Sequence, residues 1–233
     1  MWHKNHWPMC VCIVAALFPA PIVSISAQDV SPVALSADLD HRARYLFAGM
    51  PFSTGPVIQG TVRIGYDGWT FNAFANYDAD LTEINEGDVW GDYYHQFNDV
   101  VGGFVGGALY NFRIAGEWEL TPEVYGGLVL ALPGTPTLYY ARDFDLTTGD
   151  HAALTLSHGL PVGNARIEAT GRVEYNNGYY REGSSFSYTD LNVALPVALG
   201  PLTITPMVSF VGALADDFES RVVGGLNAHI AIR

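Results

Sequence analysis

Lysine and cysteine are almost missing from this chain of 233 residues: Lys4 is the only lysine, and Cys10 and Cys12 are the only cysteines. The chain after this N-terminal segment can therefore form no structural disulfide, thiolate metal site, Schiff-base lysine or thiol nucleophile. Positive charge is scarce as well, because ten arginines stand against 24 acidic residues. DNA and RNA binding requires Lys and Arg to neutralise phosphates, so we expect no nucleic-acid partner.

The first 27 residues are typical of a secretory signal peptide. Lys4 lies in a short polar start, an apolar stretch covers Met9–Phe18, and small residues precede a cleavage point after Ala27. A membrane anchor is the alternative, but about ten apolar residues are too few for the roughly 20 that a spanning helix needs. We expect the mature protein to be one domain over residues 28–233, which lacks both long apolar runs and a cysteine for a lipid anchor.

Apolar and polar residues alternate with the period of a β-strand along most of the mature chain. In Ala165–Tyr175, the odd positions are apolar or small, whereas Arg166, Glu168, Arg172 and Glu174 share the other face. A helix would spread these four charges around its circumference, and no long segment shows helical periodicity. Twelve such segments start near residues 33, 57, 69, 88, 100, 121, 136, 151, 165, 187, 202 and 221.

The connections between these segments alternate in length. The even-numbered ones are tight and turn-like, at residues 67–68, 98–99, 132–135, 161–164 and 200–201. The odd-numbered ones are mostly longer and more polar, at residues 47–56, 78–87, 143–150, 176–186 and 215–220. This pattern predicts an up-and-down antiparallel meander with short turns at one end and long loops at the other.

The sequence favours a transmembrane β-barrel over a soluble all-β domain, although alternation alone fits both. The chain offers about 17 residues per strand and connection, which fits spanning strands of roughly 9 to 11 residues. Strands can cross hydrocarbon only as a closed ring, because unpaired backbone groups are costly there. Twelve is even, which places both termini on the periplasmic side. Aromatic residues expected on the outer face near strand ends suit a lipid boundary: Tyr66, Trp69, Tyr77, Tyr110, Phe112, Tyr175 and Phe210.

Three segments near the start carry a resemblance to a known family: Tyr45–Ser53, Gly55–Gly60 and Gly65–Trp69. With their aromatic-rich first strand, a loop closed by a Pro-Val-Gln type of stretch and a glycine-and-aromatic hairpin, they resemble the TorF family of porins. Looser matches follow in order at Glu123–Leu128, Tyr140–Asp145 and Leu202–Pro206. The resemblance implies an outer-membrane barrel with a pore function and brings no catalytic residues.

Charged side chains of both signs are expected to face the lumen. One interpretation is a charged constriction that filters ions or small polar solutes; the alternative is a salt-bridge network that fills the barrel and fixes strand register. Twelve strands lie between the eight that enclose only side chains and the sixteen that leave a water channel, so both stay open. The predicted pore-lining residues are Arg63, Arg113, Glu123, Arg166, Glu168, Arg172, Glu174, Arg221 and His229.

Other chemistry has little support in the sequence. Acids cluster in two expected external loops, at residues 78–88 and 216–219, but no spacing matches a defined calcium or magnesium loop, and a solvated acidic surface explains them. Ser157 and His158 are adjacent, so they point to opposite faces of a strand and cannot form a nucleophile and base pair. His229 has no second His or Cys placed to join it as a metal ligand. We expect no enzyme, no metal and no cofactor.

The sequence therefore predicts an outer-membrane porin that lets small hydrophilic solutes or ions diffuse passively through a β-barrel channel. The alternative is a non-conducting barrel with a structural or surface-interaction role through its acidic external loops. Expected partners are outer-membrane lipid, the barrel assembly machinery of a Gram-negative envelope, and small polar solutes or ions. The chain ends in Ile230–Arg233 rather than in the aromatic residue with which outer-membrane barrels usually end.

Overall fold

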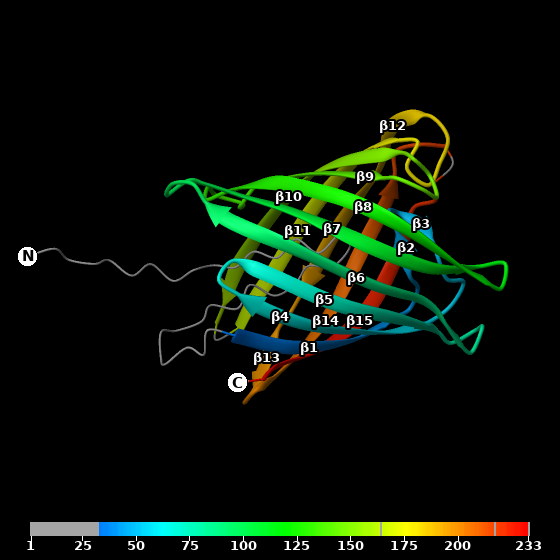
Figure 1. Ribbon diagram of the computed structural model, residues 1–233. Coiled ribbons are helices and arrows are strands. Elements are labelled where there is room, and N and C mark those ends of the chain that lie inside the picture. The colour runs from blue at the N-terminus through cyan, green and yellow to red at the C-terminus, as the bar shows by residue number, and fades with distance from the viewer. Residues whose placement is uncertain (1–32, 164, 217, 233) are drawn as a thin grey trace, which may run out of the picture.

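The computed structural model in Figure 1 describes residues 33–163, 165–216 and 218–232, and the expected signal peptide, residues 1–27, lies outside them. All regular structure in the described residues is β. No helix there is long and apolar enough to cross a bilayer. The barrel strands are β1 (Val33–Arg42), β4 (Val57–Tyr66), β5 (Trp69–Asp78), β6 (Glu83–Gln96), β7 (Val101–Ile114), β8 (Glu117–Leu130), β9 (Thr137–Asp143), β10 (Asp150–Val162), β11 (Ala165–Asn177), β12 (Ser184–Ala194), β14 (Leu202–Ala213) and β15 (Arg221–Ile232).

These strands form one closed antiparallel ring. Each strand pairs with its neighbours in the chain, and the ring closes because β1 pairs with both β4 and β15 while β12 pairs with β14. Closure gives each of the twelve barrel strands a paired neighbour on both sides, which is the condition for crossing hydrocarbon. The predicted all-β, up-and-down barrel of twelve strands is confirmed.

One barrel strand is interrupted. After β12, the chain breaks at Leu195 and Pro196 and resumes as the short β13 (Val197–Leu199), which also pairs with β14. The facing strand carries Pro206, whose carbonyl accepts a hydrogen bond from the Leu195 amide at 3.0 Å. Neither proline has an N–H to donate, so the hydrogen-bond ladder is thinned on both strands here.

The two ends of the barrel differ in their connections. The turn end holds the start of β1 and the end of β15, where Leu35 pairs with Ile232, together with the connections at residues 67–68, 97–100, 131–136, 163–164 and 200–201. The loop end holds the connections at residues 43–56, 79–82, 115–116, 144–149, 178–183 and 214–220. Two of these loop-end connections are tight. Ala115 and Gly116 (φ 51° and 91°) turn the chain within two residues. The connection at residues 79–82 is short because β6 begins early.

The early start of β6 changes the predicted acidic loop. The strand begins at Glu83 rather than near residue 88, so Glu86 and Asp88 lie on the barrel wall and are buried inside it. A bulge opposite Asn76 and Tyr77 shifts the register there, which hides the alternation in the sequence. The external connection between β5 and β6 is therefore only residues 79–82, and the dense acidic surface expected there does not exist.

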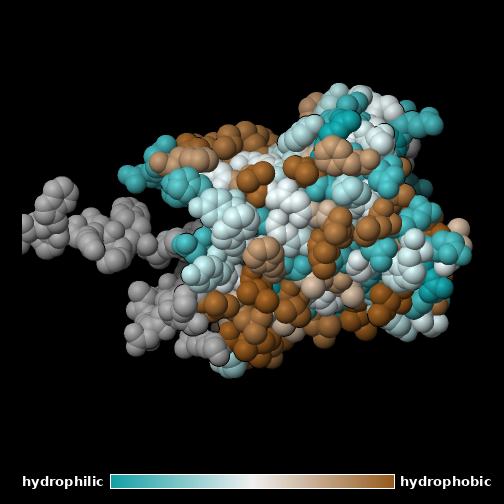
Figure 2. Space-filling model, viewed as in Figure 1, coloured by the Kyte–Doolittle hydropathy of each residue, from teal (hydrophilic) through white to brown (hydrophobic). Residues whose placement is uncertain are grey.

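Apolar side chains cover the outer face of the ring. Along β4, Ile58, Val62, Ile64 and Tyr66 are exposed, whereas the alternate Gln59 is buried inside. Figure 2 shows hydrophobic residues spread over the outside of the strands and hydrophilic residues at both ends of the barrel. The outward face is apolar and the inward face is polar, as the alternation predicts.

Strand β7 departs from the predicted assignment of faces. Tyr110 and Phe112 were expected outside and Arg113 inside, but both rings are buried in the lumen. Arg113 lies on the opposite face, opposite the exposed Trp118 of β8, and its guanidinium pairs with Glu83 at 2.8 Å. Aromatic rings fit either face of a barrel wall, so an aromatic alternation cannot decide which face is inside.

The longest loop-end connection folds into the barrel. Residues 43–56, here called the plug hairpin, contain β2 (Leu46–Phe47) and β3 (Met50–Pro51), which pair only with each other. Phe47 is buried among rings of the wall and of the 178–183 loop. The core of the molecule is this aromatic cluster inside the loop half of the barrel.

Candidate functional site

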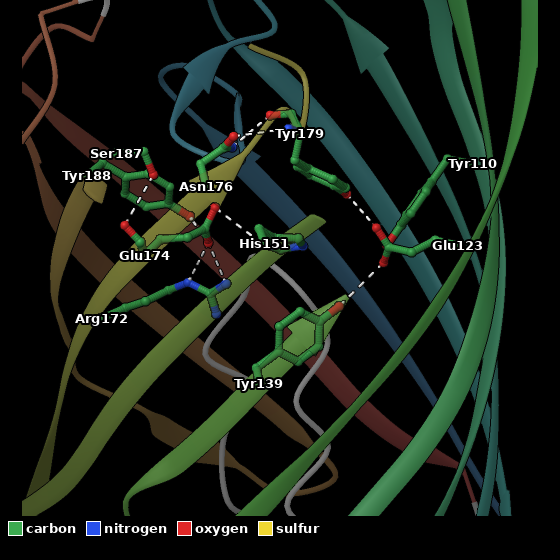
Figure 3. Close-up of polar contacts among 10 residues, drawn as sticks. All are labelled: Tyr110, Glu123, Tyr139, His151, Arg172, Glu174, Asn176, Tyr179, Ser187 and Tyr188. Atoms are coloured by element: carbon green, nitrogen blue, oxygen red, sulfur yellow. Dashed lines mark hydrogen bonds and ion pairs between the residues drawn. The ribbon is translucent and has the colours of Figure 1, made fainter. Parts of the chain in front are cut away.

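The lumen of the loop half is built around two buried carboxylates, Glu123 on β8 and Glu174 on β11 (Figure 3). Three tyrosine hydroxyls converge on Glu123: Tyr179 donates at 2.6 Å, Tyr110 at 3.1 Å and Tyr139 at 3.4 Å. Several hydroxyl donors can hold a carboxylate in place without a positively charged side chain. The cluster therefore ties the wall strands β7, β8 and β9 to the 178–183 loop.

Glu174, unlike Glu123, is held by a positively charged side chain. Arg172, on the same inward face two residues earlier, donates to Glu174 Oε2 from Nη2 at 2.6 Å and from Nε at 3.2 Å. The Tyr188 hydroxyl donates to the same oxygen at 3.0 Å, and His151 Nδ1 lies 3.3 Å from Oε1 without the alignment of a hydrogen bond. This buried set joins β10, β11 and β12 around one anion.

The 178–183 loop reaches inward because Asn176 holds its backbone. Asn176 Oδ1 accepts a hydrogen bond from the Tyr179 amide at 3.0 Å, and Asn176 Nδ2 donates to the Tyr179 carbonyl at 2.7 Å. Gly178 takes a positive φ of 72°, which reverses the chain at low steric cost. The Tyr179 ring then stacks on His151 with a centroid distance of 4.1 Å. Burial, reinforced by the charge of Glu123, raises the pKa of Tyr179, so its hydroxyl stays a donor.

The other predicted lumen residues are spread over the two ends. His229 and Arg63 both contact Asp38, His229 through Nδ1 at 2.9 Å and Arg63 through an ion pair at 3.8 Å. At the turn end, Arg166 pairs with Glu168 at 2.9 Å and stays largely exposed. At the loop end, Arg221 pairs with Glu219. Arg113 is the predicted residue that the structure places outside, so the predicted set does not form one ring.

The plug hairpin packs into the lumen through aromatic contacts. Phe47 meets Tyr110, Phe112 and Tyr180 edge to face at centroid distances of 5.7, 5.2 and 5.2 Å. The Tyr45 hydroxyl donates to Glu86 Oε1 at 3.1 Å. Gly49 (φ 81°) packs so closely on the Tyr188 ring that an added Cβ would lie 2.3 Å from it. The sequence does not predict this plug, because a loop carries no local pattern that shows whether it folds inward.

We expect Tyr179→Phe to lower the free energy of unfolding by about 1.5 kcal/mol, because it deletes a hydrogen bond to a charged group. Tyr180→Phe is the matched control, since the Tyr180 hydroxyl has no hydrogen-bond partner among the described residues. Urea unfolding in lipid vesicles measures both. Equal losses in the two variants would contradict the role given to Glu123.

Among the described residues, no group of three or more His, Cys, Asp or Glu is placed to hold a metal ion. The lumen residues therefore offer hydrogen bonds, charge and aromatic surface.

Comparison with known proteins finds no matching family model and no matching curated protein. Among solved structures, the chain is similar to CdiB from Acinetobacter baumannii, with a TM-score of 0.48, 10% identity, and coverage of 88% of this chain and 61% of CdiB. It is also similar to the translocator domain of the autotransporter NalP from Neisseria meningitidis, with a TM-score of 0.44, 13% identity, and coverage of 88% and 89%. The chain thus spans about three fifths of the length of CdiB. The strand pairing, not these distant similarities, carries the fold assignment.

Proposed function

We propose that this chain is an outer-membrane β-barrel through which small hydrophilic solutes or ions diffuse passively, and that the plug hairpin keeps the lumen closed at rest. The observation that carries the proposal is the closed ring with apolar residues outside and charged residues inside. A soluble barrel has the opposite arrangement of faces. The signal-like residues 1–27 and the resemblance to the TorF porins agree with this location and role.

The hairpin is suited to be a movable closure. Its two short strands pair with each other and not with the wall, so it can leave without breaking the ring. Its contacts with the wall are ring packing and single hydrogen bonds such as Tyr45 to Glu86. Closing loops of this kind move without unfolding their scaffold.

A second candidate is a barrel that never conducts. It is favoured by the wall residues Tyr110, Phe112, Tyr125 and Tyr139, which lie in the same buried cluster as the plug hairpin. If these rings fill the lumen by themselves, the barrel has a structural or surface-display role, and movement of the hairpin opens no path.

Planar-bilayer recordings of the folded full chain separate the two candidates. We expect discrete openings that are rare, because the closed arrangement is well packed. Heat-modifiable migration in detergent gels verifies that the inserted protein is a folded barrel. Complete silence of verified barrels, in the wild type and in a variant with a loosened hairpin, would contradict the pore.

A further inference from the structure

Six inward side chains form a continuous row across six neighbouring strands. In register order they pair across the ladder, from Thr205 on β14 through β15, β1, β4 and β5 to Glu86 on β6. All six are buried. We call this row the acceptor strip, and its members are Thr205, Asn227, Asp40, Gln59, Asn76 and Glu86.

Five members of the strip have polar side-chain atoms without a hydrogen-bond partner in the described part of the chain, although Asn227, Asn76 and Glu86 each make a hydrogen bond through another atom. Among the described residues, nothing bonds to Thr205 Oγ1, Asn227 Oδ1, Asn76 Oδ1, Glu86 Oε2 or either amide atom of Gln59. Buried polar atoms in proteins nearly always have a partner, and a cluster without one needs a physical explanation. Five of these six atoms are oxygens, so the missing partner is a hydrogen-bond donor.

The strip runs along the lumen as well as around it. Barrel strands tilt by roughly 35 to 45° from the barrel axis, so a row of register partners climbs along that axis. Thr205 is the fourth residue of β14 from the turn end, and Glu86 is the fourth residue of β6 from the loop end. A solute that follows the row therefore moves from one half of the lumen to the other.

The wall that carries the strip is acidic. The guanidinium of Arg42 pairs with Asp40 at 3.3 Å, and that of Arg63 lies 3.8 Å from Asp38. Further inward carboxylates on β5 and β6 have no Arg ion pair among the described residues: Asp78, Glu86, Asp88 and Asp92. Buried carboxyl groups without a cationic partner are costly to ionise and are stabilised by a cation beside them, so the donor that this wall fits is positively charged.

The plug hairpin already presents one donor to the strip. The Tyr45 hydroxyl donates to Glu86 Oε1 at 3.1 Å, at the end of the row that lies nearest the loops. A solute that donates a hydrogen bond to Glu86 would therefore compete with the hairpin for this carboxyl group.

We propose that the acceptor strip is the binding path for small cations that donate hydrogen bonds, of the primary-ammonium class, and that Tyr45 occupies its loop-side end at rest. This inference rests on the proposed pore function and adds the class of solute to it. The oxygens lie one per strand in a row, about 4.8 Å apart, so they cannot surround a bare alkali ion, whereas an N–H group can donate to them singly. The surrounding carboxyl groups favour a cation over a neutral molecule.

The test compares methylammonium with potassium. Reversal potentials in bilayers with potassium chloride on one side and methylammonium chloride on the other should give a methylammonium preference in the wild type. The double variant Gln59→Met and Thr205→Val removes three partnerless polar atoms and breaks no hydrogen bond among the described residues. We expect it to fold and to reduce the methylammonium-to-potassium permeability ratio about threefold or more.

Thr170→Val on β11 is the control, because this residue faces the same lumen away from the strip, with its hydroxyl 3.5 Å from Ser157. Its permeability ratio should equal that of the wild type. A ratio unchanged in the double variant, or lowered equally in the control, would overturn the assignment of the strip.

A binding measurement keeps the strip testable without conduction. A cation that binds only the folded barrel raises its unfolding midpoint. Methylammonium should therefore raise the midpoint above that in equal potassium for the wild type and not for the double variant. Silence in the bilayer with this shift present would remove the pore and keep the site. Absence of the shift would remove the site, whether or not the barrel conducts.

Discussion

Phe47→Ala should raise the ratio of open to closed channels about 100-fold. Truncating a buried Phe costs roughly 3 kcal/mol or more, and here that cost falls on the closed arrangement in which the plug hairpin is packed. Phe47 contacts rings of the wall and of the 178–183 loop, whereas the strand ring does not depend on it. Single-channel recordings of open probability measure the effect directly.

Phe144→Ala is the matched control for this variant. Phe144 also lies in a loop-end connection, but its side chain is exposed, so its removal should leave the open probability unchanged. If Phe47→Ala opens no more often than Phe144→Ala, the wall rings of Tyr110 and Phe112 close the lumen without the hairpin. The non-conducting barrel would then be the better description.

Leu191→Arg should lower the free energy of unfolding in lipid vesicles by about 2 to 4 kcal/mol. Leu191 lies on the outer face of β12 and is 54% exposed, and it pairs with Gly171 at the middle of β11. An arginine there would place its charge in hydrocarbon near the centre of the bilayer. Urea titration followed by tryptophan fluorescence measures the loss.

The same substitution outside the spanning part separates lipid burial from a general cost of arginine. Leu214 follows the end of β14 in a loop-end connection and is 50% exposed. Leu214→Arg should cost between 0 and about 1 kcal/mol. Equal small losses at the two positions would mean that the apolar outer face lies in water, and the membrane location would be wrong.

The strand ring was predictable because a period of two is a local signal. The starts of β1, β4, β5, β11, β14 and β15 coincide with the predicted positions, since their outward residues are apolar and their inward residues polar. β6 and β8 begin about five and four residues earlier than predicted, at Glu83 and Glu117, because polar residues near a strand end resemble a loop in the sequence. In both strands it is pairing with a neighbour, not composition, that sets the boundary.

The lumen was less predictable than the wall. Alternation places Glu123 and Glu174 inside, but it does not state that three tyrosines from distant segments meet at one carboxylate and an arginine at the other. Gln59 was visible only as a polar position, and its lack of partners depends on the packing of the whole ring. Contacts of this kind depend on tertiary structure, which a single sequence does not encode locally.

The interruption between β12 and β13 makes the barrel wall uneven in strength. A ring of strands separates most easily where neighbouring strands share the fewest hydrogen bonds. Here neither Pro196 nor Pro206, on the facing strand, has an amide hydrogen to donate. We therefore expect thermal fluctuations that separate neighbouring strands to begin at this junction, near the turn end. Lipid and water would then reach the backbone first at this junction, while the rest of the barrel stays closed.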